Sequence, residues 1–314
     1  MQWQPSTSIQ GLKQRAHLNA YVRAFFEQRQ VLEVETPLLS KAAVSDASLQ
    51  PIASNAMGAP CFLHTSPEYP MKRLLAAGSG DIYQICKTFR DQEQGNRHNP
   101  EFSMLEYYRL GFNLGMLMDE VAQLIGDYLH IQQRSDFSYS QAMQRFANIH
   151  PFTISDSELR TCVDQFVGNE LTLSRDECLD VVMSHVVEPK LPHNELVFIH
   201  SYPASQAALA NTYESAHGYE VAQRFELYVN GLELANGYDE LVDSTEQAKR
   251  FELEAGKRQQ VGLPQAQYDE HFLQALQAGL PQCAGVAIGL DRILMLKMKV
   301  SSIRDVLSFD FERA

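Results

Sequence analysis

The sequence of 314 residues predicts an α+β fold in which an antiparallel sheet is flanked by helices. Extended segments separated by turn-forming loops predict strands that pair locally, at 82–91, 102–110 and 224–236. Segments with helical periodicity lie between and after them, at 112–130, 246–260 and 268–278. Because local hairpins are typical of antiparallel sheets, a doubly wound parallel sheet is disfavoured.

The N-terminal part of the chain predicts two helices joined by an extended piece. Residues 12–30 carry one apolar stripe at helical spacing, formed by Leu18, Val22, Phe25 and Phe26. The extended piece covers 31–39. Ser66 is a suitable N-cap and Pro67 a suitable first helical residue, and Gly78 suits the position just after the end of that helix.

The stretch 138–190 is predicted to be a helical insertion in a single domain that spans residues 1–314. Two capping boxes open apolar stripes in it: Ser155 to Glu158 and Ser174 to Glu177. Small residues at 285–289 predict a strand that can approach another group closely, and a helix is expected from Leu290.

Composition and charge limit the classes of function. The net charge of −13, from 26 basic and 39 acidic residues, argues against a broad nucleic-acid surface. No segment has the composition of a membrane span or signal peptide, so no membrane partner is expected. The odd, scattered cysteines predict a reducing, cytoplasmic setting without a zinc site or disulfides: Cys61, Cys86, Cys162, Cys178 and Cys283.

The hairpin at 82–110 carries polar side chains on one face. The two-residue strand period puts Gln84, Cys86, Thr88 and Arg90 together, and likewise Phe102, Met104, Glu106 and Tyr108. Burying such groups is costly unless they meet a charged ligand. With Arg97 and His98 in the connecting loop, this hairpin can hold phosphates and a flat ring. The alternative is an ordinary hairpin with a solvated loop.

A second hairpin, FELYVNGLELANGYDEL, covers 225–241. Its Asn230-Gly231 pair predicts a type I′ turn. This turn would pair two couples of apolar residues on one face: Val229 with Leu232, and Leu227 with Leu234.

Acidic side chains fall on the other face of this hairpin. Glu226, Tyr228 and Glu233 share it, and two carboxylates there suit a magnesium ion carried by phosphates, or a cationic ligand. Glu240 has the wrong parity for this face in a regular strand, and a bulge at 236–237 would re-aim it. The alternative is a solvated outer face.

The three elements, in this order, resemble the signature motifs of class II aminoacyl-tRNA synthetases. The first motif is the helix and strand that end at Pro37, which forms the dimer interface in that family and so implies a homodimer. The second comprises Phe89-Arg90 and 98–102, and the third extends from Gly285 to Arg292. The segments FRDQEQGNRHNPEFSMLEYY and FELYVNGLELANGYDEL resemble the lysyl branch, and the resemblance covers nearly the whole chain.

Within that branch the chain is similar to stand-alone paralogues that attach (R)-β-lysine to translation elongation factor P. Lysyl-tRNA synthetases have an N-terminal anticodon-binding barrel, which is not expected here because the first-motif helix begins close to Met1. The segments PASQAALA and GVAIGLDR also resemble these paralogues. The resemblance implies ATP-dependent formation of an acyl-adenylate and transfer to a lysine ε-amino group of elongation factor P, with tRNA not expected as a partner.

Matched positions imply roles in binding ATP. Arg90 is expected to hold the α-phosphate and the substrate carboxylate, and Arg292 the γ-phosphate, helped by Arg97 and His98. Phe102 is expected to stack on adenine.

The same comparison implies sites for the amino acid and for Mg²⁺. Glu233 is expected to bind Mg²⁺, with Glu240 as a second ligand, and Arg90, Arg292 and Glu233 are the expected catalytic residues. Asn236 is assigned to the substrate carboxylate. The two ammonium groups of a lysine-type substrate are expected to lie among Glu68, Glu106, Tyr108 and Glu240.

Two positions depart from the family pattern. A glutamate is expected two places after the second-motif arginine, but this chain has Gln92 followed by Glu93, so either side chain can make the adenine-side contact. Ala287 replaces the glycine typical of lysyl-tRNA synthetases. Its methyl group is expected to crowd an α-amino group and to favour an amino group on the β-carbon.

Two alternative functions remain open on sequence. One is a free-standing lysine-activating enzyme, similar to lysyl-tRNA synthetase, that acts on tRNA or a small amine. The other is an inactive, synthetase-like regulatory subunit. An inactive paralogue is expected to lose its phosphate and metal residues, whereas this chain retains Arg90, Glu233, Glu240 and Arg292.

Overall fold

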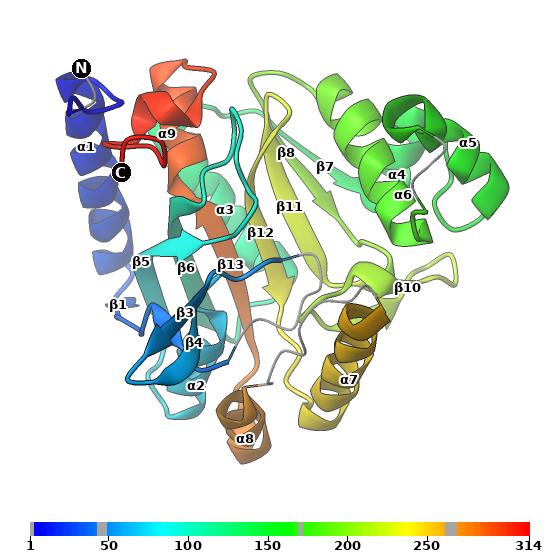
Figure 1. Ribbon diagram of the computed structural model, residues 1–314. Helices are drawn as coiled ribbons and strands as arrows, with labels where there is room; N and C mark the ends of the chain where they lie inside the picture. The colour runs from blue at the N-terminus through cyan, green and yellow to red at the C-terminus, as the bar shows by residue number, and fades with distance from the viewer. Residues whose placement is uncertain (1–2, 43–48, 169–171, 261–268) are drawn as a thin grey trace. The chain divides into compact units, whose positions relative to one another are not determined.

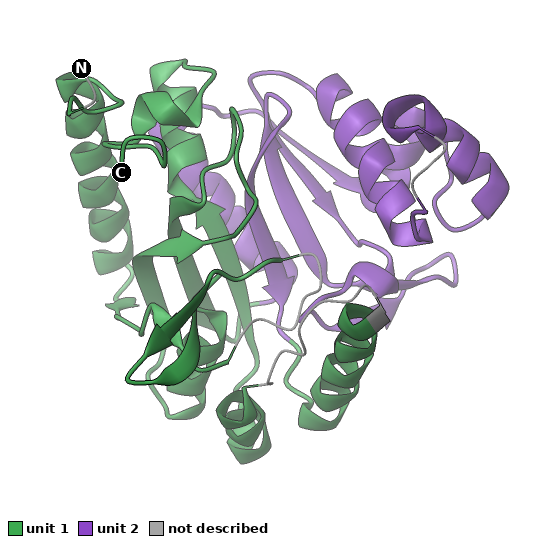
Figure 2. Ribbon diagram, viewed as in Figure 1, with its two compact units in different colours: residues 1–112, 241–314 green, residues 113–240 purple. Residues whose placement is uncertain are grey.

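The computed structural model describes residues 3–42, 49–168, 172–260 and 269–314 (Figure 1). The chain divides into two compact units, Met1–Phe112 with Leu241–Ala314, and Asn113–Glu240 (Figure 2). Antiparallel pairs dominate the sheet in each unit, which confirms the α+β prediction. The prediction of one catalytic domain over 1–314 stays a prediction.

In the first unit, four strands lie in the order β1, β5, β6, β13. Their bounds are Leu32–Glu33, Ile82–Phe89, Glu101–Leu110 and Cys283–Gly289. The pairs β5–β6 and β6–β13 are antiparallel, and only the short β1 runs parallel to β5. A separate small sheet contains β2 (Leu39–Ser40), β4 (Ala59–Leu63) and β3 (Ala53–Ala56).

The helices of the first unit are α1 (Ile9–Glu27), α2 (Glu68–Ala76), α7 (Ser244–Gln260), α8 (Glu270–Gly279) and α9 (Leu290–Met298). In α1 the predicted stripe Leu18, Val22, Phe25 and Phe26 is buried. Phe26 stacks on Tyr83 of β5, with ring centroids 4.5 Å apart. This contact fastens α1 to the sheet through the face that the sequence pattern predicted.

The start of α2 differs by one residue from the prediction. The helix begins at Glu68, and Pro67 rather than Ser66 occupies the N-cap position. The Ser66 hydroxyl still accepts the Glu68 N–H at 3.0 Å, so serine satisfies one free donor of the first turn. Gly78 follows the helix with a φ of 88°, as expected for a glycine that ends a helix.

In the second unit, the strands lie in the order β12, β11, β8, β7. Their bounds are Leu232–Asp239, Arg224–Val229, Leu196–His200 and Arg134–Ser138. The strand β11 is antiparallel to β12 and β8, while β7 is parallel to β8. The unit also contains α3 (Leu114–Leu129) and a short pair, β9 (Thr212–Glu214) with β10 (Glu220–Ala222).

Helices occupy the described part of 138–190. They are α4 (Tyr139–Ala142), α5 (Asp156–Val167) and α6 (Arg175–Val182), with short π and 3₁₀ turns at Met143–Ala147, Met183–Val187 and Glu188–Lys190. Both predicted capping boxes are present at the starts of α5 and α6. Side chains from these helices join the core of the unit, among them Leu159, Val163 and Val182.

The turn between β11 and β12 confirms one prediction and corrects another. Asn230 and Gly231 have φ of 55° and 67°, as a type I′ turn requires. Beyond the turn, however, a register shift pairs Leu227 with Ala235 instead of the predicted Leu234. The extra residue is a β-bulge, and it lies before 236–237, where a bend was expected.

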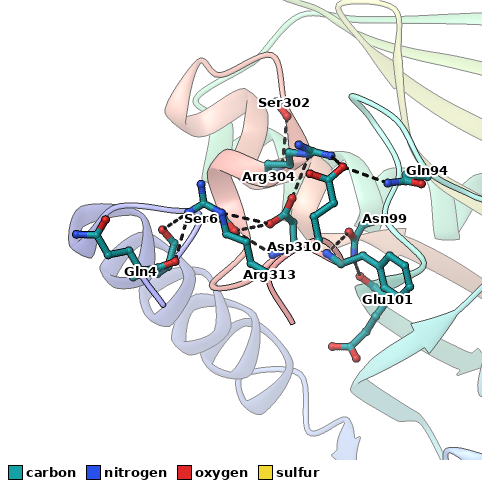
Figure 3. Close-up of polar contacts among 12 residues, drawn as sticks. Gln4, Ser6, Gln94, Asn99, Glu101, Ser302, Arg304, Asp310 and Arg313 are labelled. Carbon is teal, nitrogen blue, oxygen red and sulfur yellow. Dashed lines mark hydrogen bonds and ion pairs between the residues drawn. The ribbon is translucent and has the colours of Figure 1, made fainter. Parts of the chain in front are cut away.

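The two ends of the first unit are tied together by hydrogen bonds (Figure 3). Ser6 Oγ donates to Asp310 Oδ1 at 2.7 Å, and Arg313 donates to the Gln4 and Pro5 carbonyls. Arg304 Nε lies 3.1 Å from Asp310 Oδ2. Among the helices within the described ranges, none is long and apolar enough to cross a membrane.

Candidate active site

The register of the first unit brings the predicted polar residues onto one sheet face. Gln84 of β5 lies directly opposite Glu106 of β6, and Thr88 lies opposite Phe102. On the other side of β6, Ala287 of β13 also lies opposite Glu106. Since directly paired residues of an antiparallel sheet point the same way, these side chains share a face.

Arg90 and Phe102 form the part of this face expected to meet ATP. The Arg90 guanidinium carbon lies 5.1 Å from the centroid of the Phe102 ring. Arg90 Nη1 is 3.5 Å from Glu93 Oε1, whereas Gln92 is exposed and has a φ of 63°. Of the two candidates left open by the sequence, Glu93 therefore lies beside Arg90.

His98 and Arg292 meet although 194 positions separate them along the chain. Arg292 lies in the first turn of α9, as predicted, and its Nη2 is 2.9 Å from His98 Nε2. Arginine can only donate, so His98 Nε2 accepts and the imidazole is neutral. Burial and the positive charge of Arg292 lower the pKa of His98, which keeps it in this form.

The loop between β5 and β6 is held by the C-terminal segment (Figure 3). The Ile303 N–H donates to the Asn96 carbonyl at 2.8 Å, and the Phe311 N–H donates to Asn99 Oδ1 at 3.1 Å. Asn99 is buried, and its Nδ2 donates to the Glu101 carbonyl at 2.6 Å. These contacts flank Arg97, which is exposed in the same loop.

Asp291 anchors the start of α9 and was not identified from the sequence. It is buried, its Oδ2 accepts the Ser103 N–H at 2.6 Å, and its Oδ1 forms an ion pair with Arg15 of α1. Because both oxygens of Asp291 are engaged by Ser103 and Arg15, this carboxylate holds the helix start in place and is not assigned to the site. In the sequence, its position next to Arg292 in GVAIGLDR was the only indication of a role.

Glu106 is the centre of the group expected to bind ammonium. Its Oε1 accepts from the Tyr108 hydroxyl at 2.7 Å, and its Oε2 accepts from Ser66 Oγ at 2.8 Å. Burial, with a contribution from the nearby charge of Glu68, raises the pKa of Glu106 to about 7. A carboxyl of this kind binds a cation most strongly when it is ionised, and a bound cation favours that ionised form.

Lys72 is a buried cation that the sequence reading missed. Its side chain is fully shielded from solvent, with Nζ 2.6 Å from Glu68 Oε1 and 5.7 Å from the centre of the Phe272 ring. The spacing of four residues between Glu68 and Lys72 was the available signal, because it brings two helical side chains together. The ammonium group that lies against Glu68 in this structure is therefore that of Lys72.

In the second unit, Glu226 lies within a buried network of donors. It accepts from the Tyr202 hydroxyl at 2.6 Å, and also from the Tyr228 hydroxyl and the Arg224 guanidinium. Arg224 Nε further donates to Asn236 Oδ1 at 3.3 Å. The network therefore fixes Asn236 on the same face as Glu226.

The bulge in β12 also decides where Glu233 and Glu240 belong. Glu233 is opposite Tyr228, while Asn236 is opposite Glu226 beyond the shift. Asn236 and Tyr238 therefore continue the face of Glu233 after the bulge. Glu240 follows directly after β12 and forms an isolated bridge with Ala210. Glu240 is 1% exposed, and its backbone carbonyl accepts from Asn211 Nδ2 at 2.9 Å.

Comparison with known proteins gives consistent results over the whole length. A family model described as tRNA synthetases class II (D, K and N) matches residues 1–313. Curated relatives named "Elongation factor P--(R)-beta-lysine ligase" include one from Pectobacterium atrosepticum, 43% identical over 99% of this chain and 98% of its own length. Others from Salmonella dublin and Erwinia tasmaniensis are 44% identical with the same coverage.

Proposed function

Because the chain belongs to the class II tRNA synthetases of the D, K and N type, we propose that it activates (R)-β-lysine with ATP and attaches it to elongation factor P. The acceptor is the ε-amino group of a lysine on that protein. The observation that carries this proposal is the similarity, over almost the full length of both chains, to relatives whose name states this ligase activity. The reaction releases pyrophosphate and then AMP.

In the first step, a carboxylate oxygen of the amino acid bonds to the α-phosphorus of ATP as the bond to pyrophosphate breaks. Arg90 is proposed to hold the α-phosphate and the carboxylate, and Arg292 the γ-phosphate, with Arg97 and His98 assisting. Positioning and charge neutralisation supply most of the catalysis in phosphoryl transfer. The contact between Arg292 Nη2 and His98 Nε2 supports this assignment, because it brings the two side chains together.

Phe102 is proposed to stack on adenine, and Arg90 lies over the same ring. Glu93, rather than Gln92, is proposed for the adenine-side contact, because it is the one that lies beside Arg90. Stacking on an aromatic face suits a flat base.

The amino acid is proposed to bind through its two ammonium groups and its carboxylate. Glu68, Glu106, Tyr108 and Glu240 are assigned to the ammonium groups, and Asn236 to the carboxylate. Burial and the charge of nearby Glu68 raise the pKa of Glu106, which supports placing the two carboxylates at one amine site. Ala287 lies opposite Glu106, where its methyl group takes up space beside the proposed amine site.

Mg²⁺ is proposed to be held by Glu233 and Glu240. Carboxylate oxygens are suitable ligands, and Mg²⁺ commonly uses only one or two of them together with phosphates and water. Glu226, on the same face, is engaged by Arg224 and by the hydroxyls of Tyr202 and Tyr228. When bound, the ion would neutralise part of the phosphate charge.

In the second step, the amine of the acceptor lysine attacks the acyl carbon, an amide bond forms and AMP leaves. No enzyme side chain needs to bond covalently to the acyl group. We also propose that the enzyme acts as a homodimer in the cytoplasm. The dimer is supported by apolar side chains exposed in the first-motif region, namely Ile9, Leu32, Leu38 and Leu39.

The test is ATP–pyrophosphate exchange with (R)-β-lysine and with α-lysine, followed by transfer assays on elongation factor P and on tRNA. The proposal predicts exchange that is stronger with (R)-β-lysine and that is lost in Arg90→Ala and Arg292→Ala. Exchange with neither amino acid contradicts an activating enzyme. Charging of tRNA without modification of the protein supports the alternative, a lysine-activating enzyme that acts on RNA.

A further inference from the structure

Gln84 is a buried polar residue in the middle of the proposed amine site, and none of the roles assigned above uses it. It lies on β5, directly opposite Glu106, and its side chain is 2% exposed. The face that it shares with Glu106 also carries Ala287 on the far side of β6.

The two ends of the Gln84 amide are in different situations. The amide forms a side-chain hydrogen bond with Cys86, two residues along the same strand face. Burial raises the pKa of the Cys86 thiol to about 12, and the contact with Gln84 opposes part of this rise. Gln84 Oε1, by contrast, is shielded from solvent and has no hydrogen-bond partner among the residues that the structure describes. A thiol is a weak partner, so the amide is incompletely satisfied.

A buried acceptor without a donor is expensive for a folded protein. Leaving such a group unsatisfied costs about 1–3 kcal/mol, so nearly all buried polar atoms in native proteins have a partner. A leucine or methionine at this position would fill similar space without that cost. An N–H donor from outside the described chain would satisfy this acceptor.

The surroundings identify the chemistry of that donor. Oxygen atoms dominate this part of the face: both carboxylate oxygens of Glu106, the Tyr108 hydroxyl and Ser66 Oγ. Burial and the charge of Glu68 raise the pKa of Glu106 by more than the nearby Lys72 lowers it. A ligand with several N–H donors and a positive charge, an alkylammonium group, suits such a set of acceptors.

We propose that Gln84 Oε1 accepts a hydrogen bond from the substrate ammonium group that lies against Glu106, which makes Gln84 a specificity-determining residue. The inference rests on the proposed function, because it needs a lysine-type substrate. A neutral acceptor adds directional recognition of N–H without adding a second negative charge beside Glu106. Replacement by glutamate would not be equivalent, because two close buried carboxylates raise each other's pKa.

The test compares Gln84→Met with wild type, because methionine has similar volume and lacks the amide. KM for the lysine-type substrate is expected to rise about tenfold or more, as for loss of a hydrogen bond to a charged group, while KM for ATP stays within twofold. The melting temperature of the substrate-free protein is expected to stay the same or rise, because an unsatisfied acceptor has been removed. A purely structural role would lower it.

Cys86→Ala is the matched control. It removes the other partner of the amide from the same face, and its KM for the amino acid is expected to change by less than threefold. Gln84→Leu serves as a second variant if the methionine substitution does not fold. Two lysine analogues, each lacking a different one of the two amines, complete the experiment. The analogue without the amine that lies against Glu106 is expected to bind equally to wild type and Gln84→Met, because it has no group for Gln84 to bind.

A KM for the amino acid within twofold of wild type in Gln84→Met overturns the inference, because it means that Gln84 Oε1 does not bind the substrate in the wild-type enzyme. Equal increases in both KM values, or an equal penalty with both analogues, also overturn it. Failure of the proposed function is distinguishable, because it would appear as absence of lysine-dependent exchange in the wild-type enzyme.

Discussion

Substitution of Glu106 by glutamine is expected to change how stability depends on pH. The pKa of Glu106 is raised from the usual 4.5 to about 7, chiefly by burial. The folded protein therefore binds this proton more tightly than the unfolded chain. The contribution of Glu106 to the free energy of unfolding is therefore largest below pH 4.5 and decreases as the pH rises towards 7. A shift of this size corresponds to about 3 kcal/mol, at about 1.4 kcal/mol for each pKa unit.

Glutamine mimics the protonated acid and cannot ionise. The free energy of unfolding, measured by urea denaturation without substrate, is expected to rise in Glu106→Gln relative to wild type by about 2.5 kcal/mol between pH 5 and pH 8. A constant offset is also expected, because the amide can accept from only one of Ser66 and Tyr108. Parallel stability curves for the two proteins over this pH range would refute the reasoning.

Three further variants test other contacts. Ala287→Gly is expected to shift the adenylation ratio towards α-lysine by about 1 kcal/mol or more in pyrophosphate exchange, and an unchanged ratio contradicts a role of the methyl group in selection. His98→Ala removes the acceptor from Arg292 and is expected to raise KM for ATP about tenfold with little change in KM for the amino acid; a smaller effect on ATP argues against the pair. Asp310→Ala is expected to lower the free energy of unfolding by about 2 kcal/mol, since it removes the acceptor shared by Ser6 and Arg304; urea denaturation at constant pH would detect no change if that network were unimportant.

Much of the fold follows from local patterns. The apolar stripe of α1, the Asn230-Gly231 turn and the capped starts of α5 and α6 are all produced by residues close together in sequence, so period and capping chemistry predict them. The strand faces that carry Gln84 and Glu106 follow from the period of two, because β5 and β6 stay regular throughout.

What the sequence did not reveal depends on packing over longer distances. The bulge at Leu234 has no glycine or proline to mark it, and the Asn-Gly pair at 236–237 was a stronger local signal. Lys72 was missed because a lysine on a helix is usually solvated, and its burial depends on α8 and Phe272. For Gln84, the strand period predicts its face, but only the folded chain shows that its carbonyl lacks a donor.

The most direct test of the central claim is the mass of elongation factor P after incubation with this protein, ATP and (R)-β-lysine. The account predicts an increase equal to one added lysyl group on a single lysine side chain, dependent on ATP and absent with Arg292→Ala. An unchanged mass, under conditions in which the same preparation supports pyrophosphate exchange with (R)-β-lysine, would contradict transfer to this acceptor.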